Sequence, residues 1–313
     1  MIFFSIIIPL YNKEPYIAKT INSVLNQTYQ HYELIVVNDG STDNSAMVAE
    51  KLLKDIPNSR VINQVNMGVS IARNNGVLQA KGDYICFLDA DDWWDISFLE
   101  EMQLMVKKFP EAGLWGCNYW YVKKGMTRLM NKHVSNGYIN FFQEFSTLAP
   151  IICVGSVCLK KTLFNNLKGF NSEIKLGEDF DLWVRISLNS RIAYVNKPLC
   201  YYNQNVNTLN RGIGRLHEPS KNMLWNMDYL EEEEKNNPYY KQLIDRLRVY
   251  GLYPYYLSEK YHEIAKQELL KVDWNKQSFK YKFYYSLPVT LLRTYNNILK
   301  ILSNIKQKFL SSL

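Results

Sequence analysis

Short apolar runs alternate with helical patterns over the first 90 residues of the chain. The runs are rich in β-branched residues, each ends in a polar cluster, and they cover residues 4–9, 33–38, 60–62 and 83–88. Between them, apolar positions recur with helical spacing over residues 14–26, 43–55 and 69–80. Strands that alternate with helices are typical of βαβ units in a parallel sheet that is buried on both faces. The sequence therefore predicts an α/β fold with a mostly parallel sheet flanked by helices.

The remainder of the chain first mixes both periodicities and then becomes helical. Helices are predicted over 97–108 and 178–188, and strands over 114–122, 151–159 and 192–197. Asn, Gly and Arg cluster near 205–220, and beyond that cluster every pattern is helical. We predict an α/β domain over residues 1–215 and a helical C-terminal region over residues 216–313, which fits the usual size of domains.

Two carboxylates, Asp89 and Asp91, flank Ala90 directly after the apolar run at 83–88. Ligands of open α/β sheets bind at the carboxyl ends of the strands, so both acids are expected to face one crevice. Hard carboxylate oxygens suit Mg²⁺ or Mn²⁺, which also take ligands from substrate phosphates. The alternative is a helix N-cap with additional acids in its first turn. The position after a buried strand favours the metal site.

Two further polar clusters follow predicted strands or open predicted helices. Asp39 ends the run at 33–38 and precedes Gly40, a tight-turn signal, so its carboxylate is expected to accept hydrogen bonds from a base or a ribose. Arg73 lies one turn inside the helix at 69–80, where a cation faces a phosphate or is an ordinary surface residue.

Glu178 and Asp179 begin the helix predicted at 178–188. Acids at a helix start are favoured electrostatically, which is a sufficient structural explanation. A carboxylate that faces the crevice would instead take the proton from an attacking hydroxyl. Trp93 and Trp94 follow the acidic cluster and either stack on a sugar face as acceptor contacts or pack in the core.

These motifs, in this order, resemble the family 2 glycosyltransferases of bacterial surface-polysaccharide synthesis, which are inverting enzymes with the Rossmann-like GT-A fold. The resemblance covers about residues 4–190 and rests on the segments Ser5–Glu14, Val37–Asp43, Asn66–Asn74, Asp89–Asp92 and Gly177–Asp179. It implies that residues 1–215 are the catalytic domain. It also implies transfer of a sugar from a nucleoside diphosphate, UDP by default, to an acceptor hydroxyl.

The resemblance also implies a role for each matched residue. The donor contacts are Pro9, Tyr11, Asn12, Glu14, Asp39, Arg73, Asp89 and Ala90. Asp91, with Asp89, holds Mn²⁺ or Mg²⁺, Asp179 is the general base, and Glu178 beside it shapes the acceptor site. The metal stabilises the departing diphosphate.

The chain departs from the family pattern after the last predicted strand. Many relatives carry a basic residue or a histidine there, but this sequence has Tyr201-Tyr202-Asn203-Gln204-Asn205. Arg211, Arg215 or His217 from the following loop would have to approach the diphosphate instead. The third metal ligand therefore stays open.

The excess positive charge lies in the last 40 residues. The net charge is +7, from 37 basic and 30 acidic residues, and the seven basic residues that follow Asp273 account for all of it. Leu291, Tyr295 and Ile298 begin an apolar stripe with helical spacing that continues to Leu313. A basic helix with an aromatic flank predicts binding of residues 274–313 to an anionic membrane surface, and packing on the protein or a partner is the alternative. No nucleic-acid-binding module is visible.

Several protein classes are disfavoured by what the sequence lacks. The five cysteines form no C-x-x-C pair, which disfavours a zinc cluster or a disulfide framework and favours a cytoplasmic protein. The first residues predict a buried strand instead of a signal peptide, and no run of about 18 apolar residues predicts a membrane span. We therefore expect a cytoplasmic location, either free or peripheral on the cytosolic face of the membrane.

Three hypotheses compete with an enzyme that builds a surface polysaccharide or a lipid-linked glycan. A non-catalytic subunit that binds a sugar nucleotide would explain the missing histidine. A nucleotidyltransferase would need a phosphate-binding loop rich in Gly and Lys near the first strand, and the segment Tyr11–Glu14 does not have that composition. A dinucleotide-dependent dehydrogenase would need G-x-G-x-x-G after a strand.

Overall fold

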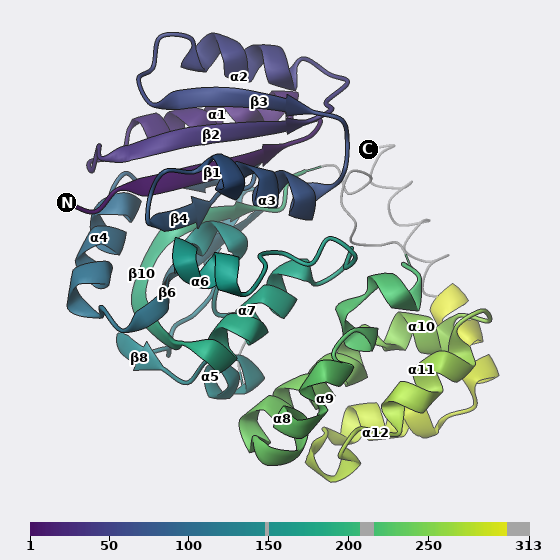
Figure 1. Ribbon diagram of the computed structural model, residues 1–313. Coiled ribbons are helices and arrows are strands. Elements are labelled where there is room, and N and C mark those ends of the chain that lie inside the picture. The colour runs from purple at the N-terminus through teal and green to yellow at the C-terminus, as the bar shows by residue number, and fades with distance from the viewer. Residues whose placement is uncertain (148–149, 207–215, 299–313) are drawn as a thin grey trace. The chain divides into compact units, whose positions relative to one another are not determined.

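The computed structural model describes residues 1–147, 150–206 and 216–298, which form two compact units, Met1–Asn226 and Met227–Leu313 (Figure 1). The domain boundary predicted after residue 215 falls at the end of the segment 207–215, which lies outside the described residues, and it stays a prediction.

A mixed sheet forms the centre of the first unit. Its strands, among the described residues, are β1 Phe4–Leu10, β2 Tyr32–Asp39, β3 Ser59–Gln64, β4 Tyr84–Phe87, β5 Trp93–Trp94, β6 Ala112–Lys123, β7 Met126–Leu129, β8 Gly137–Ile139, β9 Val157–Lys160 and β10 Arg191–Asn203. The order is β3-β2-β1-β4-β9-β6-β10-β5, with β7 beside β6 and β8 beside β10. The first four strands are parallel, as predicted. β9 is antiparallel to both of its neighbours, β4 and β6.

Helices flank this sheet, which confirms the predicted α/β class (Figure 1). They are α1 Glu14–Leu25, α2 Ser45–Leu53, α3 Val69–Gln79, α4 Phe98–Lys108, α5 Phe141–Thr147, α6 Lys161–Asn166 and α7 Glu178–Asn189. The strand predicted over 151–159 is shorter than expected, because a 3₁₀ turn over Val154–Ser156 precedes β9.

Alternate side chains of β1 pack toward different helices, as expected for a strand buried on both faces. Phe4, Ile6 and Ile8 join a core cluster with apolar side chains of α1 and α4. Ile7 points toward α3, where a Cβ on Gly76 would lie 2.4 Å from the Ile7 side chain. Only glycine therefore allows α3 to approach β1 this closely.

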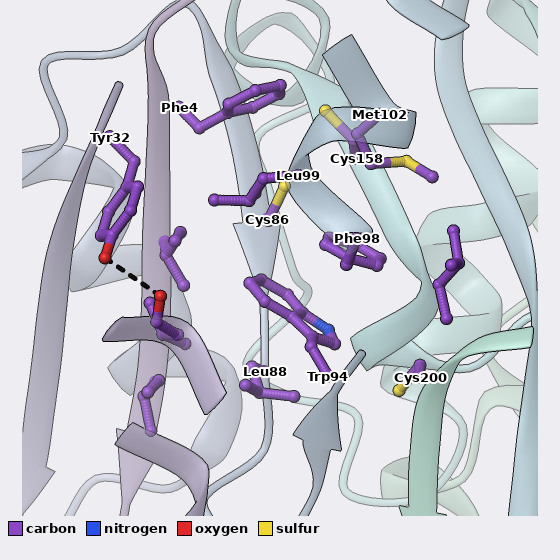
Figure 2. Close-up of a cluster of buried hydrophobic side chains, with 14 of the residues drawn as sticks. Phe4, Tyr32, Cys86, Leu88, Trp94, Phe98, Leu99, Met102, Cys158 and Cys200 are labelled. Atoms are coloured by element: carbon purple, nitrogen blue, oxygen red, sulfur yellow. Dashed lines mark hydrogen bonds between the residues drawn. The ribbon is translucent and has the colours of Figure 1, made fainter. Parts of the chain in front are cut away.

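The core cluster between β1, β4, α1 and α4 contains large aromatic side chains (Figure 2). Trp94 is 3% exposed and stacks on Phe98 with ring centroids 4.0 Å apart. The Tyr32 hydroxyl donates to the Val24 carbonyl at 3.0 Å, so its buried polar atom is satisfied. All five cysteines are free thiols.

A buried charge network fixes the amino ends of the first strands. The Glu33 carboxylate accepts hydrogen bonds from the Ser5 hydroxyl at 2.7 Å, from the Arg60 guanidinium at 2.8 Å and from the Lys81 backbone amide. Burial alone would raise the pKa of Glu33, but these donors lower it below its usual value. The network joins β1, β2 and β3 at the end of the sheet opposite Asp39.

The second unit is helical throughout its described residues, as predicted. Its helices are α8 Glu231–Asn236, α9 Pro238–Gly251, α10 Tyr253–Leu257, α11 His262–Leu269 and α12 Phe279–Ser286, followed by helical residues 289–298. Arg248, which is 4% exposed, donates to both carboxylate oxygens of Glu234, at 2.5 and 2.9 Å. A bidentate buried pair of this kind orients α8 against α9.

Apolar side chains of the second unit lie at its surface near the basic residues. Phe279 is 80% exposed, and Phe283, Leu291, Tyr295 and Ile298 are each about half exposed. Arg293 is engaged within the unit, since it donates to the carbonyls of Leu257 and Ser258. The rest of the predicted stripe, from residue 299 onward, lies outside the described residues. No helix in the described ranges has the length and apolar character needed to span a bilayer.

Candidate active site

The carboxyl ends of β1, β2 and β4 meet the start of α7 around one cavity of about 580 Å³. Most of the residues predicted to carry the chemistry line it: Pro9, Tyr11, Asp39, Arg73, Asp89, Ala90, Asp91, Glu178 and Asp179. The parallel direction of the strands explains this convergence, because parallel strands present their carboxyl ends at one edge.

Asn12 and Glu14 do not line the cavity. The Asn12 side chain exchanges hydrogen bonds with Thr42, and the Glu14 carboxylate accepts from the backbone and side-chain amides of Asn44. Both residues therefore tie the loop after β1 to the loop after β2. They hold the cavity wall in place, and direct donor contact by either one stays a prediction.

Trp93 and Trp94 also lie off the cavity wall. The Trp94 indole N–H donates to the Gly155 carbonyl at 2.6 Å, and its ring lies within the core cluster (Figure 2). Trp93 stacks on Tyr201 with ring centroids 5.3 Å apart, and the Lys19 ammonium lies over its ring. Packing accounts for the buried ring of Trp94. Acceptor contact by the partly buried Trp93 stays a prediction.

Arg73 connects the acids on opposite sides of the cavity. Its guanidinium is 3% exposed and pairs with Asp89 at 2.7 Å and with Glu178 at 3.4 Å. The buried Nε has no hydrogen-bond partner among the described residues. The surface alternative for Arg73 is therefore wrong. One buried cation instead holds the end of β4 near the start of α7.

Asp91 and Asp92 have different surroundings despite being adjacent. Asp91 Oδ2 pairs with the Lys13 ammonium at 2.6 Å, across 78 residues of sequence. Asp92 Oδ1 accepts a hydrogen bond from the Asn203 amide at 2.7 Å, at the end of β10. Burial, with Asp91 and Asp89 nearby, raises the pKa of Asp92 well above its usual value. Asp92 therefore anchors β10, although both acids line the cavity.

Asp39 organises the loop that closes one side of the cavity. Its Oδ1 accepts from the Met67 amide and the Gln64 side chain, and its Oδ2 accepts from the Gly68 amide, at 2.7–2.8 Å. These bonds place the amino-terminal end of α3 beside the cavity. The sequence identified Asp39 but not this role, because its partners lie at the end of β3 and on the following loop, 25–29 residues away.

Glu178 and Asp179 begin α7 directly after Gly177, which has φ +87°. Burial, with the neighbouring Asp179 charge, raises the pKa of Glu178 to about 7, although Arg73 opposes the shift. Burial also raises the pKa of Asp179, whose Oδ1 accepts from the Phe180 amide at 2.8 Å. Raised carboxylate pKa values beside a cavity are typical of proton-transfer sites.

The carboxylates that line the cavity fit a hard divalent cation. In the described ranges, no three His, Cys, Asp or Glu side chains gather so as to hold a metal ion on their own. Asp89 and Asp91 supply the oxygen ligands that Mg²⁺ and Mn²⁺ accept, and such ions often complete their shells with substrate phosphates. The pair therefore fits a metal that is shared with a phosphate-bearing ligand.

Two cations on the cavity wall were not predicted from the sequence, Lys13 and Lys175. Lys13 lies within the segment already singled out, between Asn12 and Glu14, but its long-range partner is not visible in a sequence. Of the residues considered for the missing basic position, His217 does not line the cavity, and Arg211 and Arg215 lie outside the described residues.

Residues 5–164, about half of the chain, match the model of "Glycosyl transferase family 2". The chain belongs to this family.

Curated relatives match more of the chain than the family model does. Glycosyltransferase GlyA of Streptococcus pneumoniae is 31% identical over 66% of this chain and 31% of its own length. Chondroitin synthase of Pasteurella multocida is 33% identical over 70% of this chain and 22% of its own length. The chain thus spans less than a third of the length of these two relatives.

Solved structures confirm the GT-A fold. The structure of Staphylococcus aureus TarS residues 1–349 in complex with UDP-GlcNAc has a TM-score of 0.70 at 21% identity, covering 86% of this chain and 79% of that one. The mannosyltransferase PcManGT of Pyrobaculum calidifontis, in complex with GDP-Man and Mn²⁺, has a TM-score of 0.51 at 16% identity, covering 88% of each chain. The predicted family and fold are therefore both confirmed.

Proposed function

We propose that this chain is a metal-dependent, inverting glycosyltransferase that moves a sugar from a nucleoside diphosphate, UDP in the first instance, to an acceptor hydroxyl. The observation that carries the proposal is one cavity that joins Asp89 and Asp91 on one side to Glu178 and Asp179 on the other. TarS was solved with UDP-GlcNAc, which supports a UDP-linked donor.

The donor side of the cavity is formed by the ends of β1, β2 and β4. Tyr11, which is 42% exposed, and Asp39 line the part assigned to the nucleoside. Asp39 supports this part by holding the Met67 and Gly68 amides. Arg73 brings positive charge beside Asp89, where the diphosphate would lie. Asp91 and Asp89 would hold Mn²⁺ or Mg²⁺, which, when bound, neutralises the charge that develops on the leaving diphosphate.

The acceptor side is formed by the start of α7. Asp179 accepts the proton of the acceptor hydroxyl. At the same time the hydroxyl oxygen bonds to the anomeric carbon, and the bond from that carbon to the diphosphate breaks. A single displacement of this kind inverts the anomeric centre. Glu178, held by Arg73 at 3.4 Å, fixes the start of the helix and the charge next to the base.

The competing hypothesis is a sugar-nucleotide-binding subunit without activity. The preserved pair Glu178 and Asp179, both with raised pKa values in the cavity, favours the enzyme, because a binding subunit needs no proton acceptor. Turnover of the donor by the purified chain separates the two.

The acceptor is proposed to be a lipid-linked or surface polysaccharide precursor at the cytosolic face of an anionic membrane. The exposed side chains of Phe279 and Phe283, next to Lys276, Lys280 and Lys282, support this assignment. The full chain with all three lysines changed to Glu should lose binding to vesicles that contain phosphatidylserine. Changing Lys123 and Lys124, two exposed lysines of the first unit, to Glu is the control. Equal binding by both variants would contradict the membrane assignment.

The donor site is tested by thermal shifts with UDP, GDP, dTDP and CMP, each with Mn²⁺ and with EDTA. Stabilisation by one nucleotide that requires Mn²⁺ and is lost in Asp91→Ala is the expected result, and it names the base. A failure of every nucleotide to stabilise the chain would count against the enzyme and equally against the sugar-nucleotide-binding subunit.

A further inference from the structure

Lys13 is fixed so that its ammonium lies over the acid predicted to hold the metal. Its backbone amide donates to Ser45 Oγ at 2.7 Å, and its carbonyl accepts from the amides of Tyr16 and Ile17. The backbone at the start of α1 is therefore held from both sides. From there the Lys13 ammonium contacts Asp91 Oδ2 at 2.6 Å, and the side chains are only 16% and 8% exposed.

We propose that Lys13 is a built-in counter-ion for Asp91, which a divalent cation must displace and which then binds the diphosphate of the donor. The inference rests on the proposed function. It adds a diphosphate-binding residue and a coupling between the metal and the donor.

The physical basis is competition for one carboxylate. Asp91 Oδ2 is already paired, so a metal that arrives alone gains its bond but breaks a partly buried ion pair, whose loss leaves an uncompensated ammonium. Lys13 lines the same cavity, so the displaced ammonium stays within reach of any diphosphate bound there. With the diphosphate present, the ammonium regains an anionic partner. The metal and the diphosphate should therefore bind more tightly together than separately.

Lys175 provides the matched comparison within the same cavity. It also lines the wall and carries the same charge, but its side chain is exposed and has no ion-pair partner among the described residues. Removing Lys175 changes the overall potential of the cavity, whereas removing Lys13 also takes away the ammonium that a metal must displace from Asp91. The difference between the two variants isolates the pairing.

The test uses the full-length chain and Mn²⁺ itself, with free Mn²⁺ counted by electron paramagnetic resonance, with and without UDP. In the wild type, UDP should tighten Mn²⁺ binding by about 5- to 150-fold, the usual range of coupling between sites. In Lys13→Met, Mn²⁺ alone should bind about fivefold more tightly and the tightening by UDP should fall to about twofold or less. Lys175→Met should keep the wild-type coupling factor, and Lys13→Arg, which preserves the charge, should retain most of it.

The outcomes separate this inference from the proposed function. If the wild type shows UDP-linked Mn²⁺ binding but Lys13→Met has the same coupling factor, the inference alone is wrong. If Lys175→Met loses as much coupling as Lys13→Met, general charge explains the effect and the inference is also overturned. If the wild type binds no Mn²⁺ even with UDP, the metal-dependent function fails and this inference fails with it. Should Lys13→Met unfold, Lys13→Gln keeps a polar side chain and tests the same coupling.

Discussion

Arg73 Nη2 donates a hydrogen bond of 2.7 Å to Asp89 Oδ1 from a side chain that is 97% buried, while Asp89 itself remains 30% exposed to the cavity. The pair thus joins a protected cation to an accessible anion. The Arg73 guanidinium is fixed by its burial, and the Asp89 carboxylate that it pairs with remains accessible to the cavity near Asp91.

Substitution of Arg73 by Met should destabilise the first unit by about 3 kcal/mol. Asp89 and Glu178 lose their shared counter-ion, and the removed guanidinium leaves unfilled buried space. Urea unfolding measures the change. Arg191→Met is the matched control, since Arg191 pairs with Glu111 at the surface, where both side chains are more than half exposed and the expected loss is below about 1 kcal/mol. Similar losses of unfolding free energy in Arg73→Met and Arg191→Met would show that the buried pair stabilises the protein no more than a surface pair does.

The stability of the chain should fall as the pH rises through the range in which Glu178 titrates. The folded pKa of Glu178 is raised to about 7 from an ordinary value of 4.5, so between these values the unfolded chain binds fewer protons than the folded one. In Glu178→Gln this contribution is absent, and the variant should gain stability relative to the wild type from pH 5 to pH 8. Denaturant unfolding across that range measures it. Glu111→Gln, at an exposed carboxylate, serves as the control, and parallel curves for wild type and Glu178→Gln would contradict the prediction.

Gly177→Ala should displace the start of α7 and slow the proposed sugar transfer by roughly tenfold or more, because small misplacements of catalytic groups are costly. At φ +87° a non-glycine residue loses about 1–2 kcal/mol, and its Cβ would lie 2.5 Å from the Met223 side chain. In the background of Met223→Ala the clash is absent and only the backbone strain remains. In that background Gly177→Ala should therefore cost less free energy of unfolding than in the wild type, and a double-mutant cycle measures the difference. An equal cost in both backgrounds would rule out the clash.

Asp39→Asn should loosen the loop at 65–68 and weaken nucleotide binding together. In this variant an NH₂ group replaces one carboxylate oxygen and would face a backbone N–H, so that two donors meet and one buried hydrogen bond is lost. Such a loss costs about 1–3 kcal/mol. Thermal unfolding and UDP titration check the two effects, with the exposed Asp55→Asn as control. If Asp39→Asn lost nucleotide binding without any loss of stability, the lost binding would come from direct contact of Asp39 with the nucleotide and not from loosening of the loop.

The sequence was sufficient to predict the parallel strands and the residues that their ends bring together. Asp89 and Asp91 were predicted to face one crevice because ligands of open α/β sheets bind at the carboxyl ends of the strands, and both line the cavity. An apolar run does not reveal its direction, so the antiparallel insertion of β9 between β4 and β6 was not predicted. The helical character of the second unit's described residues followed from periodicity, but the arrangement of these helices was not predicted.

Residues whose roles depend on distant partners were less predictable. Lys13 lies among predicted donor contacts, but only the folded chain brings it to Asp91. Trp94 had two interpretations that aromatic chemistry cannot separate, and packing against Phe98 decided between them here. Asp92 was read as part of the acidic cluster, whereas its hydrogen bond to Asn203 makes it an anchor for β10.

The buried Glu33 network at the amino end of the sheet has a consequence for how such a chain can evolve. It holds β1, β2 and β3 together without using any residue of the cavity, which opens at the other end of the same strands. Exchanges among cavity residues therefore leave this anchor intact. The ligand preferences of the cavity can therefore change, in evolution or by engineering, while the Glu33 network keeps the three strands together.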